Sequence, residues 1–219
     1  MDTTILCRLQ RCKVVAGFSV HDVSDAVPLA NALLAGGIDT IELTLRTPAA
    51  LAAIQEISTH CPTICLGVGT VLTKEQVTQV KQAGAHFAVA PGLNPNTIAA
   101  AKEVNLPFAP GVVTPSDIEK AIELGCKVLK FFPAQASGGV PYLKSMSAPY
   151  KHLNMHYFPL GGINADNMLD YLQLDNVCAV GGSWIVDQQL VAVKDWDGIT
   201  AKASAVCATL AGLEGSLKQ

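Results

Sequence analysis

Residues 107–133 read PFAPGVVTPSDIEKAIELGCKVLKFFP and contain one complete strand–helix–strand unit. The apolar run 107–112 comes before Thr114-Pro115, a pair typical of the first positions of a helix. Gly125 suits the left-handed position that ends many helices. A second apolar run, 128–133, follows and is closed by proline, as expected of a buried strand. The stretch therefore predicts two strands joined by a helix.

The same alternation of short β-rich runs and longer helical patterns continues along almost the whole chain. Thr73 and Asn94 stand at further N-cap positions, and Gly36 and Gly84 follow helical segments as Gly125 does. We predict strands at Val14–Val20, Thr40–Leu45, Ile64–Gly69, Phe87–Pro91, Pro107–Val112, Val128–Pro133, His156–Gly161 and Val177–Gly181. Between the strands we predict eight helices, in segments such as Ser24–Leu34, Ala49–Ser58, Lys74–Ala83, Thr97–Val104 and Ser116–Leu124, with the final one near Asp197–Leu213. A count of eight strands and eight helices predicts an α/β fold, the closed (β/α)₈ TIM barrel.

A doubly wound open sheet is the alternative fold. It normally carries a Gly-x-Gly-x-x-Gly fingerprint after its first strand. Here Gly67-Val68-Gly69 follows the third strand and lacks the third glycine. No linker, low-complexity tract or composition shift divides the chain. We therefore expect a single TIM-barrel domain over residues 1–219.

Composition excludes several classes of partner. Half of the 219 residues are hydrophobic, and the formal net charge of -3 comes without a basic block, which argues against nucleic acid and anionic membranes. Met1–Gln10 has no apolar signal-peptide core, and no stretch is apolar for long enough to span a bilayer. The seven cysteines are an odd number without a Cys-x-x-Cys motif, so we expect reduced thiols in a cytoplasmic protein.

Lys130 is the lone cation of the apolar run 128–133. Burying an ammonium group costs several kcal/mol unless it is paired or loses its proton. A neutral lysine is a nucleophile toward carbonyl carbon and forms a Schiff base. The alternative is a structural lysine whose stem packs in the strand while its head reaches water.

The second predicted strand carries polar groups on one face. Alternation places Glu42, Thr44 and Arg46 together, away from the apolar residues between them. A carboxylate inside the barrel near a buried lysine can act as a general acid and base. The fork of Arg46 matches a substrate carboxylate. A structural ion pair of Glu42 with Arg46 or with Lys130 is the other interpretation.

Two glycine pairs follow the last two predicted strands. These are Gly161-Gly162 and Gly181-Gly182, the second continued by Ser183. Glycine lets backbone N–H groups approach an anion, and the loops after strands seven and eight of barrel enzymes commonly bind phosphate. One such pair usually marks only a turn, but two pairs at the expected places predict a phosphate site.

Metal chemistry has little support in the sequence. His152 and His156 are four residues apart, but their segment runs from a proline into the seventh strand and no third ligand cluster is evident. The remaining histidines, His21, His60 and His86, are scattered. We expect neither a metal nor another cofactor.

Six short strings follow one another along the chain: ELTLRT (42–47), GTVL (69–72), PGL (91–93), KFFPA (130–134), PLGGI (159–163) and GGSW (181–184). In this order they resemble one enzyme family, the 2-keto-3-deoxy-6-phosphogluconate (KDPG) / 4-hydroxy-2-oxoglutarate (KHG) aldolases. The resemblance covers about residues 14–208. It implies a class I aldolase on a (β/α)₈ barrel, typically a homotrimer, that uses no metal.

The resemblance also implies roles for individual residues. Lys130 would form the Schiff base, and Glu42 would be the acid and base that works through a bound water. Arg46 and Thr70 would hold the pyruvate carboxylate, Pro91 and Phe132 would wall the pocket, and Gly161, Gly162, Gly182 and Ser183 would bind the substrate phosphate. The implied ligands are a phosphorylated 2-keto-3-deoxy sugar acid and pyruvate.

The chain departs from the family pattern at three places. The first strand reads Val15-Ala16-Gly17-Phe18 where a proline and aliphatic residues are common, and Gln135 replaces a common glutamate. Leu160 stands just before the glycine pair, where many relatives carry a hydroxyl residue. An apolar contact discriminates by only ~1–3 kcal/mol, so we expect Leu160 to line the pocket and to relax the choice between C4 epimers.

These patterns together predict reversible aldol cleavage of a 2-keto-3-deoxy-6-phospho sugar acid, with 4-hydroxy-2-oxoglutarate as a further substrate. An aldolase acting mainly on the galactonate C4 epimer is one alternative. A phosphate-binding barrel isomerase or epimerase is another, and it would use an acid–base pair instead of an imine. A non-catalytic barrel that binds a phosphorylated metabolite would leave the presence of Lys130, Glu42 and Arg46 unexplained.

Overall fold

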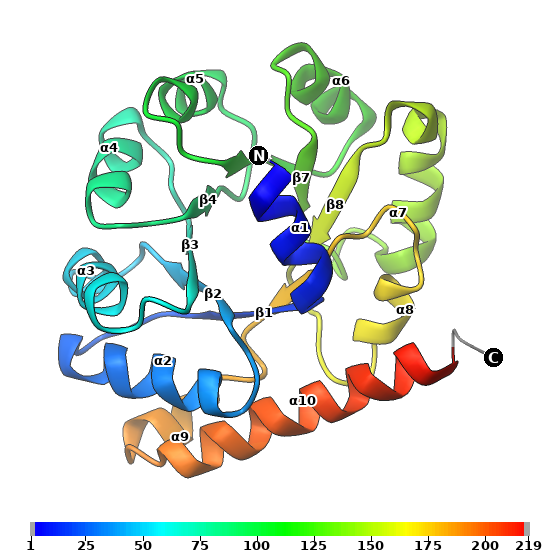
Figure 1. Cartoon of the computed structure of the whole chain (residues 1–219). Helices are drawn as coiled ribbons and strands as arrows, with labels where there is room; N and C mark the ends of the chain where they lie inside the picture. Colours follow the sequence, from blue (N-terminus) through cyan, green and yellow to red (C-terminus); the bar gives the residue numbers. More distant parts are fainter. Residues whose placement is uncertain (1–2, 217–219) are drawn as a thin grey trace.

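The computed structural model of the chain describes residues 3–216, which form a barrel of parallel strands inside a ring of helices (Figure 1). The strands are β1 Val14–Phe18, β2 Thr40–Thr44, β3 Cys65–Gly69, β4 Phe87–Val89, β5 Phe108–Ala109, β6 Gly111–Val112, β7 Val128–Phe131, β8 His156–Pro159 and β9 Val180–Gly182. Their order is β5-β4-β3-β2-β1-β9 in one sheet and β6-β7-β8 in the other.

The two sheets meet at both ends and close the barrel. At one junction β5 and β6 are two halves of a single predicted strand, interrupted at Pro110, which has no N–H to donate. At the other junction the bridges Tyr157–Val177 and Leu160–Gly181 connect the β8 and β9 segments. The predicted eight-stranded (β/α)₈ barrel is thereby confirmed, with its fifth strand split in two.

Ten α-helices surround or cap the barrel in the described part of the chain. They are α1 Thr3–Cys12, α2 Ala26–Ala35, α3 Ala50–His60, α4 Lys74–Gln82, α5 Pro95–Glu103, α6 Pro115–Glu123, α7 Gly139–Ser147, α8 Met168–Leu172, α9 Gln188–Ala192 and α10 Trp196–Ser216, with short 3₁₀ helices at Val23–Asp25 and Ala148–Leu153. Helices α1 and α9 were not among the eight that the sequence predicted. Within residues 3–216, no helix combines the length and apolar character needed to cross a membrane.

The predicted helix ends are mostly correct. Thr73, Asn94 and Thr114 each accept a hydrogen bond from a first-turn N–H, as N-caps do. Gly84 and Gly125 have φ of 98° and 68°. The prediction was wrong at Gly36, whose φ is -79°, because the next residue takes the left-handed position. A side chain at Gly36 would instead clash with Ala203 of α10, so this glycine serves the packing of α2 against α10.

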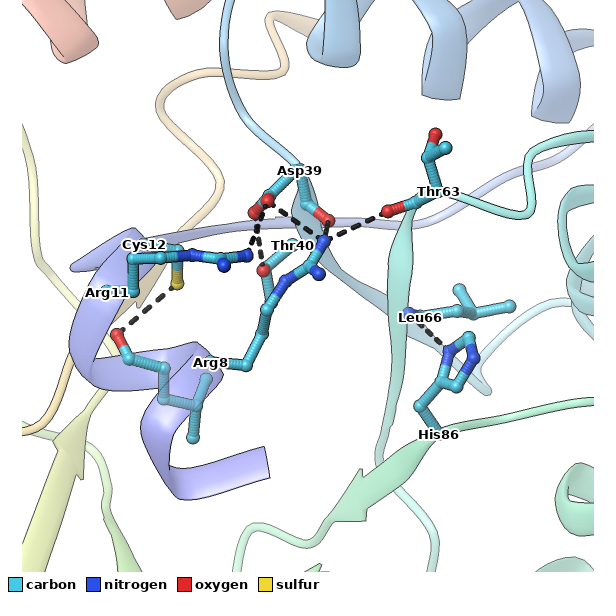
Figure 2. A network of polar contacts seen from close by, with 9 residues as sticks. Arg8, Arg11, Cys12, Asp39, Thr40, Thr63, Leu66 and His86 are labelled. Atoms are coloured by element: carbon cyan, nitrogen blue, oxygen red, sulfur yellow. Dashed lines mark hydrogen bonds and ion pairs between the residues drawn. The ribbon is translucent and has the colours of Figure 1, made fainter. Parts of the chain in front are cut away.

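Helix α1 lies across the N-terminal ends of the strands, the floor of the barrel (Figure 1). Figure 2 shows Arg8 and Arg11 reaching from α1 to Asp39, which immediately precedes β2. The Arg8 guanidinium lies 2.9 Å from an Asp39 carboxylate oxygen and donates to the Thr63 carbonyl at 2.9 Å. Nearby, His86 accepts a hydrogen bond from the Leu66 N–H, and burial lowers the pKa of its imidazole.

The inside of the barrel is a separate apolar cluster. It joins α1, through Ile5 and Leu9, to residues on the inner face of the strands, among them Phe87, Phe158 and Leu160. All seven cysteines are free thiols. Burial raises the pKa of Cys12 to about 12, of Cys178 to about 12 and of Cys65 to about 11, so these groups pack as small hydrophobes and are poor nucleophiles.

Candidate active site

A cavity of about 330 Å³ opens at the C-terminal ends of the strands, the mouth of the barrel. Every predicted site residue lines it: Glu42, Arg46, Thr70, Pro91, Lys130, Phe132, Leu160, Gly161, Gly162, Gly182 and Ser183. The structure therefore brings together groups from β2, β7 and the loops after β3, β4, β8 and β9. This is the end of the fold where barrel enzymes carry their chemistry.

Lys130 and Glu42 form a buried pair in this cavity. Lys130 Nζ lies 3.2 Å from Glu42 Oε1, and their side chains are only 7% and 2% exposed. The ammonium also lies 5.1 Å from the centre of the Phe132 ring. Of the two pairings left open by the sequence, the structure contains the one with Lys130. Oε1 is close enough to take a proton from Nζ, which would leave a nucleophilic amine.

The second carboxylate oxygen of Glu42 is available for another task. Oε2 is buried and has no hydrogen-bond partner in the described part of the chain. Leaving a buried acceptor unpaired costs roughly 1–3 kcal/mol, more for a charged group. Because Glu42 also lines the cavity, Oε2 is placed to accept a hydrogen bond from a water or a ligand group there.

Gly69 makes room for the Glu42 side chain, a role that the sequence analysis missed. It pairs with Thr44 on the neighbouring strand, and any side chain at Gly69 would clash with the Glu42 carboxylate. The next residue, Thr70, has a φ of 63°. That conformation costs a β-branched residue about 1–3 kcal/mol and is found mainly at functional sites.

Arg46 lies at the exposed rim of the cavity, just beyond the end of β2. Across residues 3–216, its guanidinium has neither an ion pair nor a hydrogen bond. The ion pair between Arg46 and Glu42, one of the two that the sequence left open, is therefore absent. An unengaged guanidinium at the entrance of a cavity is suited to an anionic ligand. Thr44, predicted on the same strand face, shares a 2.6 Å hydrogen bond with Ser19.

The first glycine loop is held in a conformation that other residues rarely adopt. Gly161 and Gly162 have φ of 93° and 79°. The Gly161 carbonyl accepts from the Gln135 N–H at 2.9 Å, and the Gly162 carbonyl accepts from Asn167 Nδ2 at 3.0 Å. Gln135 is itself fixed by Tyr171, whose hydroxyl donates to its Oε1 at 2.7 Å. The conformation of the loop is thus held by hydrogen bonds within the chain.

The second glycine loop lies beside the first. A side chain at Gly182 would clash with the Trp184 ring, and Trp184 itself lines the cavity. Neither Trp184 nor Ile163, which also lines it, was predicted to do so, although both stand in the family strings. The Ser183 carbonyl accepts from the Val186 N–H, which turns the chain and leaves the Ser183 side chain exposed at the cavity.

Leu160 lies both in the barrel core and at the cavity. It belongs to the inner barrel cluster and is only 6% exposed, as expected of a core residue. It also lines the cavity next to the first glycine loop. Its side chain therefore forms an apolar part of the cavity wall beside the first glycine loop.

The histidine pair considered as a metal site does not lie on one helix face. His152 is in the 3₁₀ helix 148–153, whereas His156 begins β8. Burial lowers the pKa of His156. In the described residues, no group of three or more His, Cys, Asp or Glu side chains is placed to hold a metal ion.

Comparison with known proteins gives a consistent result. A family model described as KDPG and KHG aldolase matches residues 5–202. The KHG/KDPG aldolase of Escherichia coli K12 is 41% identical over 190 residues, which is 87% of this chain and 88% of that protein.

Two solved structures extend the likeness to three dimensions. The KDPG aldolase of Legionella pneumophila, with pyruvate captured as a covalent carbinolamine, is 38% identical with a TM-score of 0.88, over 92% of this chain and 97% of that one. The 2-keto-3-deoxy-6-phosphogluconate aldolase of Zymomonas mobilis ZM4, with 3-phosphoglycerate, is 36% identical with a TM-score of 0.85. The match covers 94% of this chain and 96% of that one.

Proposed function

Because the chain belongs to the KDPG and KHG aldolase family, we propose that it is a class I aldehyde-lyase that cleaves KDPG to pyruvate and glyceraldehyde 3-phosphate. The observation that carries this proposal is the buried Lys130–Glu42 pair at the bottom of the mouth cavity. Cleavage of 4-hydroxy-2-oxoglutarate to pyruvate and glyoxylate is proposed as a second activity, since some relatives are named for both substrates.

The reaction begins on Lys130. Glu42 Oε1, 3.2 Å away, takes a proton from Nζ, and the free amine attacks the C2 ketone of the substrate. Glu42 returns this proton to the hydroxyl of the carbinolamine, which leaves as water and gives a protonated imine. The apolar side chains of Phe132 and Leu160 exclude bulk water from this step. Without bulk water, the positive charge of the iminium attracts electrons from the substrate more strongly.

The carbon–carbon bond then breaks. Glu42 accepts the proton of the C4 hydroxyl, C4 becomes a carbonyl, and the electron pair of the C3–C4 bond moves to the iminium. The aldehyde leaves, and the remaining enamine is protonated at C3. Water hydrolyses the imine, which releases pyruvate and restores the lysine.

The ends of the substrate are held by the cavity rim. Arg46 and Thr70 bind the carboxylate of the keto acid, because Arg46 is unengaged and offers a planar fork. The phosphate binds at the Gly161-Gly162 and Gly182-Ser183 loops, which lie next to each other across the β8–β9 bridge. Pro91 and Phe132 form the walls between these ends.

Further features of the proposal come from the family resemblance. The resemblance supports a cytoplasmic homotrimer of single-domain chains, residues 1–219, that works without a cofactor. Neither nucleic acid nor membrane is proposed as a partner. An enzyme acting mainly on the galactonate C4 epimer remains the second candidate, favoured by the apolar side chain of Leu160 beside the glycine loops.

Trapping the imine tests the proposal. Wild-type protein incubated with pyruvate and sodium borohydride should lose activity and gain one reduced pyruvyl group on Lys130. Lys130→Ala should abolish both the adduct and KDPG cleavage, whereas Lys144→Ala, which removes an exposed lysine, should change neither. An isomerase or a non-catalytic barrel would form no adduct. An adduct on another lysine, or cleavage by Lys130→Ala, would overturn the assignment.

A further inference from the structure

One wall of the mouth cavity is made largely of backbone. It runs from Leu160, through Gly181 and Gly182, to Gly17 and then Glu42. The order follows from the strand pairing, in which Leu160 bridges to Gly181, Ala16 pairs with Gly182, and Gly17 pairs with Glu42. The wall lies between the proposed Schiff-base and phosphate ends of the cavity.

Packing explains two of the three glycines in this wall. A Cβ at Gly181 would lie 2.9 Å from the Leu160 side chain and 3.0 Å from the Phe158 ring. A Cβ at Gly182 would clash with the Trp184 ring. Both positions are filled by neighbouring side chains, so glycine is required there.

Gly17 differs from these two. A Cβ at this position would lie 3.6 Å from the Gly182 carbonyl carbon and oxygen and 4.0 Å from Glu42 Oε2, which are ordinary van der Waals distances. Its φ is not among the positive values, so the backbone accepts any residue. Neither packing nor backbone geometry requires glycine at position 17. The missing side chain leaves unfilled space in a strand interior, where glycine often marks close approach of a ligand.

The space at Gly17 adjoins the carboxylate of Glu42. Glu42 Oε1 faces Lys130, whereas the unpartnered Oε2 faces Gly17. A C4 hydroxyl that gives its proton to Oε2 places C4 next to this space. The hydrogen on C4 of an ordinary substrate is too small to fill it.

We infer that Gly17 provides a subsite for one additional carbon on C4, so that the enzyme also cleaves 2-keto acids whose C4 is a tertiary alcohol and releases a ketone. The inference rests on the proposed aldolase function. Lys130 condenses with the C2 ketone with loss of water, and Glu42 takes the proton of the tertiary hydroxyl. The C3–C4 electron pair moves to the iminium, and C4 becomes the ketone carbonyl. Protonation at C3 and hydrolysis then release pyruvate and the free lysine.

A matched pair of substrates tests this subsite. 4-Hydroxy-4-methyl-2-oxoglutarate differs from 4-hydroxy-2-oxoglutarate by one methyl group on C4, and its cleavage gives two molecules of pyruvate. Pyruvate release measures kcat/KM for both. The wild type should cleave the methylated acid with an efficiency within about tenfold of the unmethylated one, because the methyl group enters existing space.

Gly17→Ala fills the space with the enzyme's own methyl group. The ratio of kcat/KM for the methylated acid over kcat/KM for the unmethylated acid should fall about 10- to 200-fold, the effect expected of one carbon in a packed pocket. Because both efficiencies are measured on one preparation, partial misfolding cancels in the ratio. Gly92→Ala is the matched control, since a Cβ at Gly92 has no atom within 4 Å, and the ratio should stay unchanged.

Three results would overturn the inference. In the first, the wild type cleaves KDPG but is more than about tenfold less efficient on the methylated acid than on the unmethylated one, or does not cleave it. In the second, Gly17→Ala leaves the ratio where it was. In the third, Gly92→Ala lowers it equally. Failure to cleave KDPG would instead contradict the proposed function, so the two failures are distinguishable.

Discussion

The floor and the mouth of the barrel each contain an ion pair, but the two pairs are built differently. On the floor, Arg8 meets Asp39 at 2.9 Å, both side chains are about 30% exposed, and the guanidinium also donates to the Thr63 carbonyl. In the mouth, Lys130 meets Glu42 at 3.2 Å with both side chains almost fully buried. There, Glu42 Oε2 has no partner within the described residues.

This difference separates stability from reactivity. The floor pair has several partners and stays in partial contact with water, so its groups stabilise the attachment of α1. The mouth pair carries the desolvation cost of two buried charges, so it contributes little to stability, and both of its side chains line the cavity where a ligand can reach them. Substitutions at the two ends should therefore change different measured quantities.

The largest expected effect on kcat comes from a conservative substitution at the mouth. Glu42→Gln keeps the shape of the side chain but removes the proton acceptor, so kcat for KDPG cleavage should fall by about 10²–10⁴. Steady-state kinetics and thermal melting check this prediction. Glu56→Gln, on the exposed face of α3, is the control and should retain wild-type kcat. Normal turnover in Glu42→Gln would show that the mouth pair is merely structural.

The next effect concerns the second glycine loop. Ser183→Ala removes one hydrogen bond to a charged group, worth roughly 1.5–3 kcal/mol, so kcat/KM for KDPG should fall about ten- to hundredfold. Cleavage of unphosphorylated 4-hydroxy-2-oxoglutarate by the same preparation is the internal control and should change little. Equal losses on both substrates would mean that Ser183 supports the loop without contacting phosphate.

A floor substitution should show the opposite pattern. Arg8→Met removes the ion pair and the hydrogen bond to the Thr63 carbonyl, so the free energy of unfolding should fall by about 1–3 kcal/mol. The melting temperature should fall by about 2–4 °C per kcal/mol, while kcat/KM below the transition stays within about twofold. Arg11→Met, where the arginine is 66% exposed, is the control and should cost less than about 1 kcal/mol. A lower kcat with unchanged melting in Arg8→Met would contradict the division between the two ends.

The smallest effect should occur at Leu160, which belongs to the inner cluster as well as to the cavity wall. Leu160→Thr supplies a hydroxyl beside the path of the substrate, so the ratio of kcat/KM for the gluconate-derived over the galactonate-derived C4 epimer should rise several-fold. Within one preparation the two epimers control for each other. A wild type that is already sharply selective, or a ratio that does not move, would show that Leu160 does not set this choice.

Much of the site was predictable because its signals are local. A cation in an apolar run indicated Lys130, strand alternation indicated Glu42 and Arg46, and the glycine pairs stand directly after the last two strands. Thr70, Pro91 and Phe132 came only from the family resemblance. Their positions in the cavity depend on loops whose own sequence carries no chemical signal.

The features that were missed depend on contacts between distant segments. Whether a glycine is demanded by packing or leaves space cannot be read locally, because the answer at Gly17 and Gly69 lies with side chains on other strands. The same holds for Gly36, whose neighbour Ala203 comes from α10. Helix α1 was not predicted, since its role is to cover a floor that exists only in the closed barrel.

The pairing of β1 with β9 has a consequence for how activity is acquired during folding. Glu42 and Arg46 are made early in synthesis, Lys130 in the middle, and the residues of both glycine loops late. Gly17 and Gly182 face each other only when the last strand has docked on the first. A nascent chain that lacks β9 can thus contain the lysine and the carboxylate without a complete site. Recovery of catalytic turnover during refolding therefore reports the final ring closure, whereas helical circular dichroism reports earlier events.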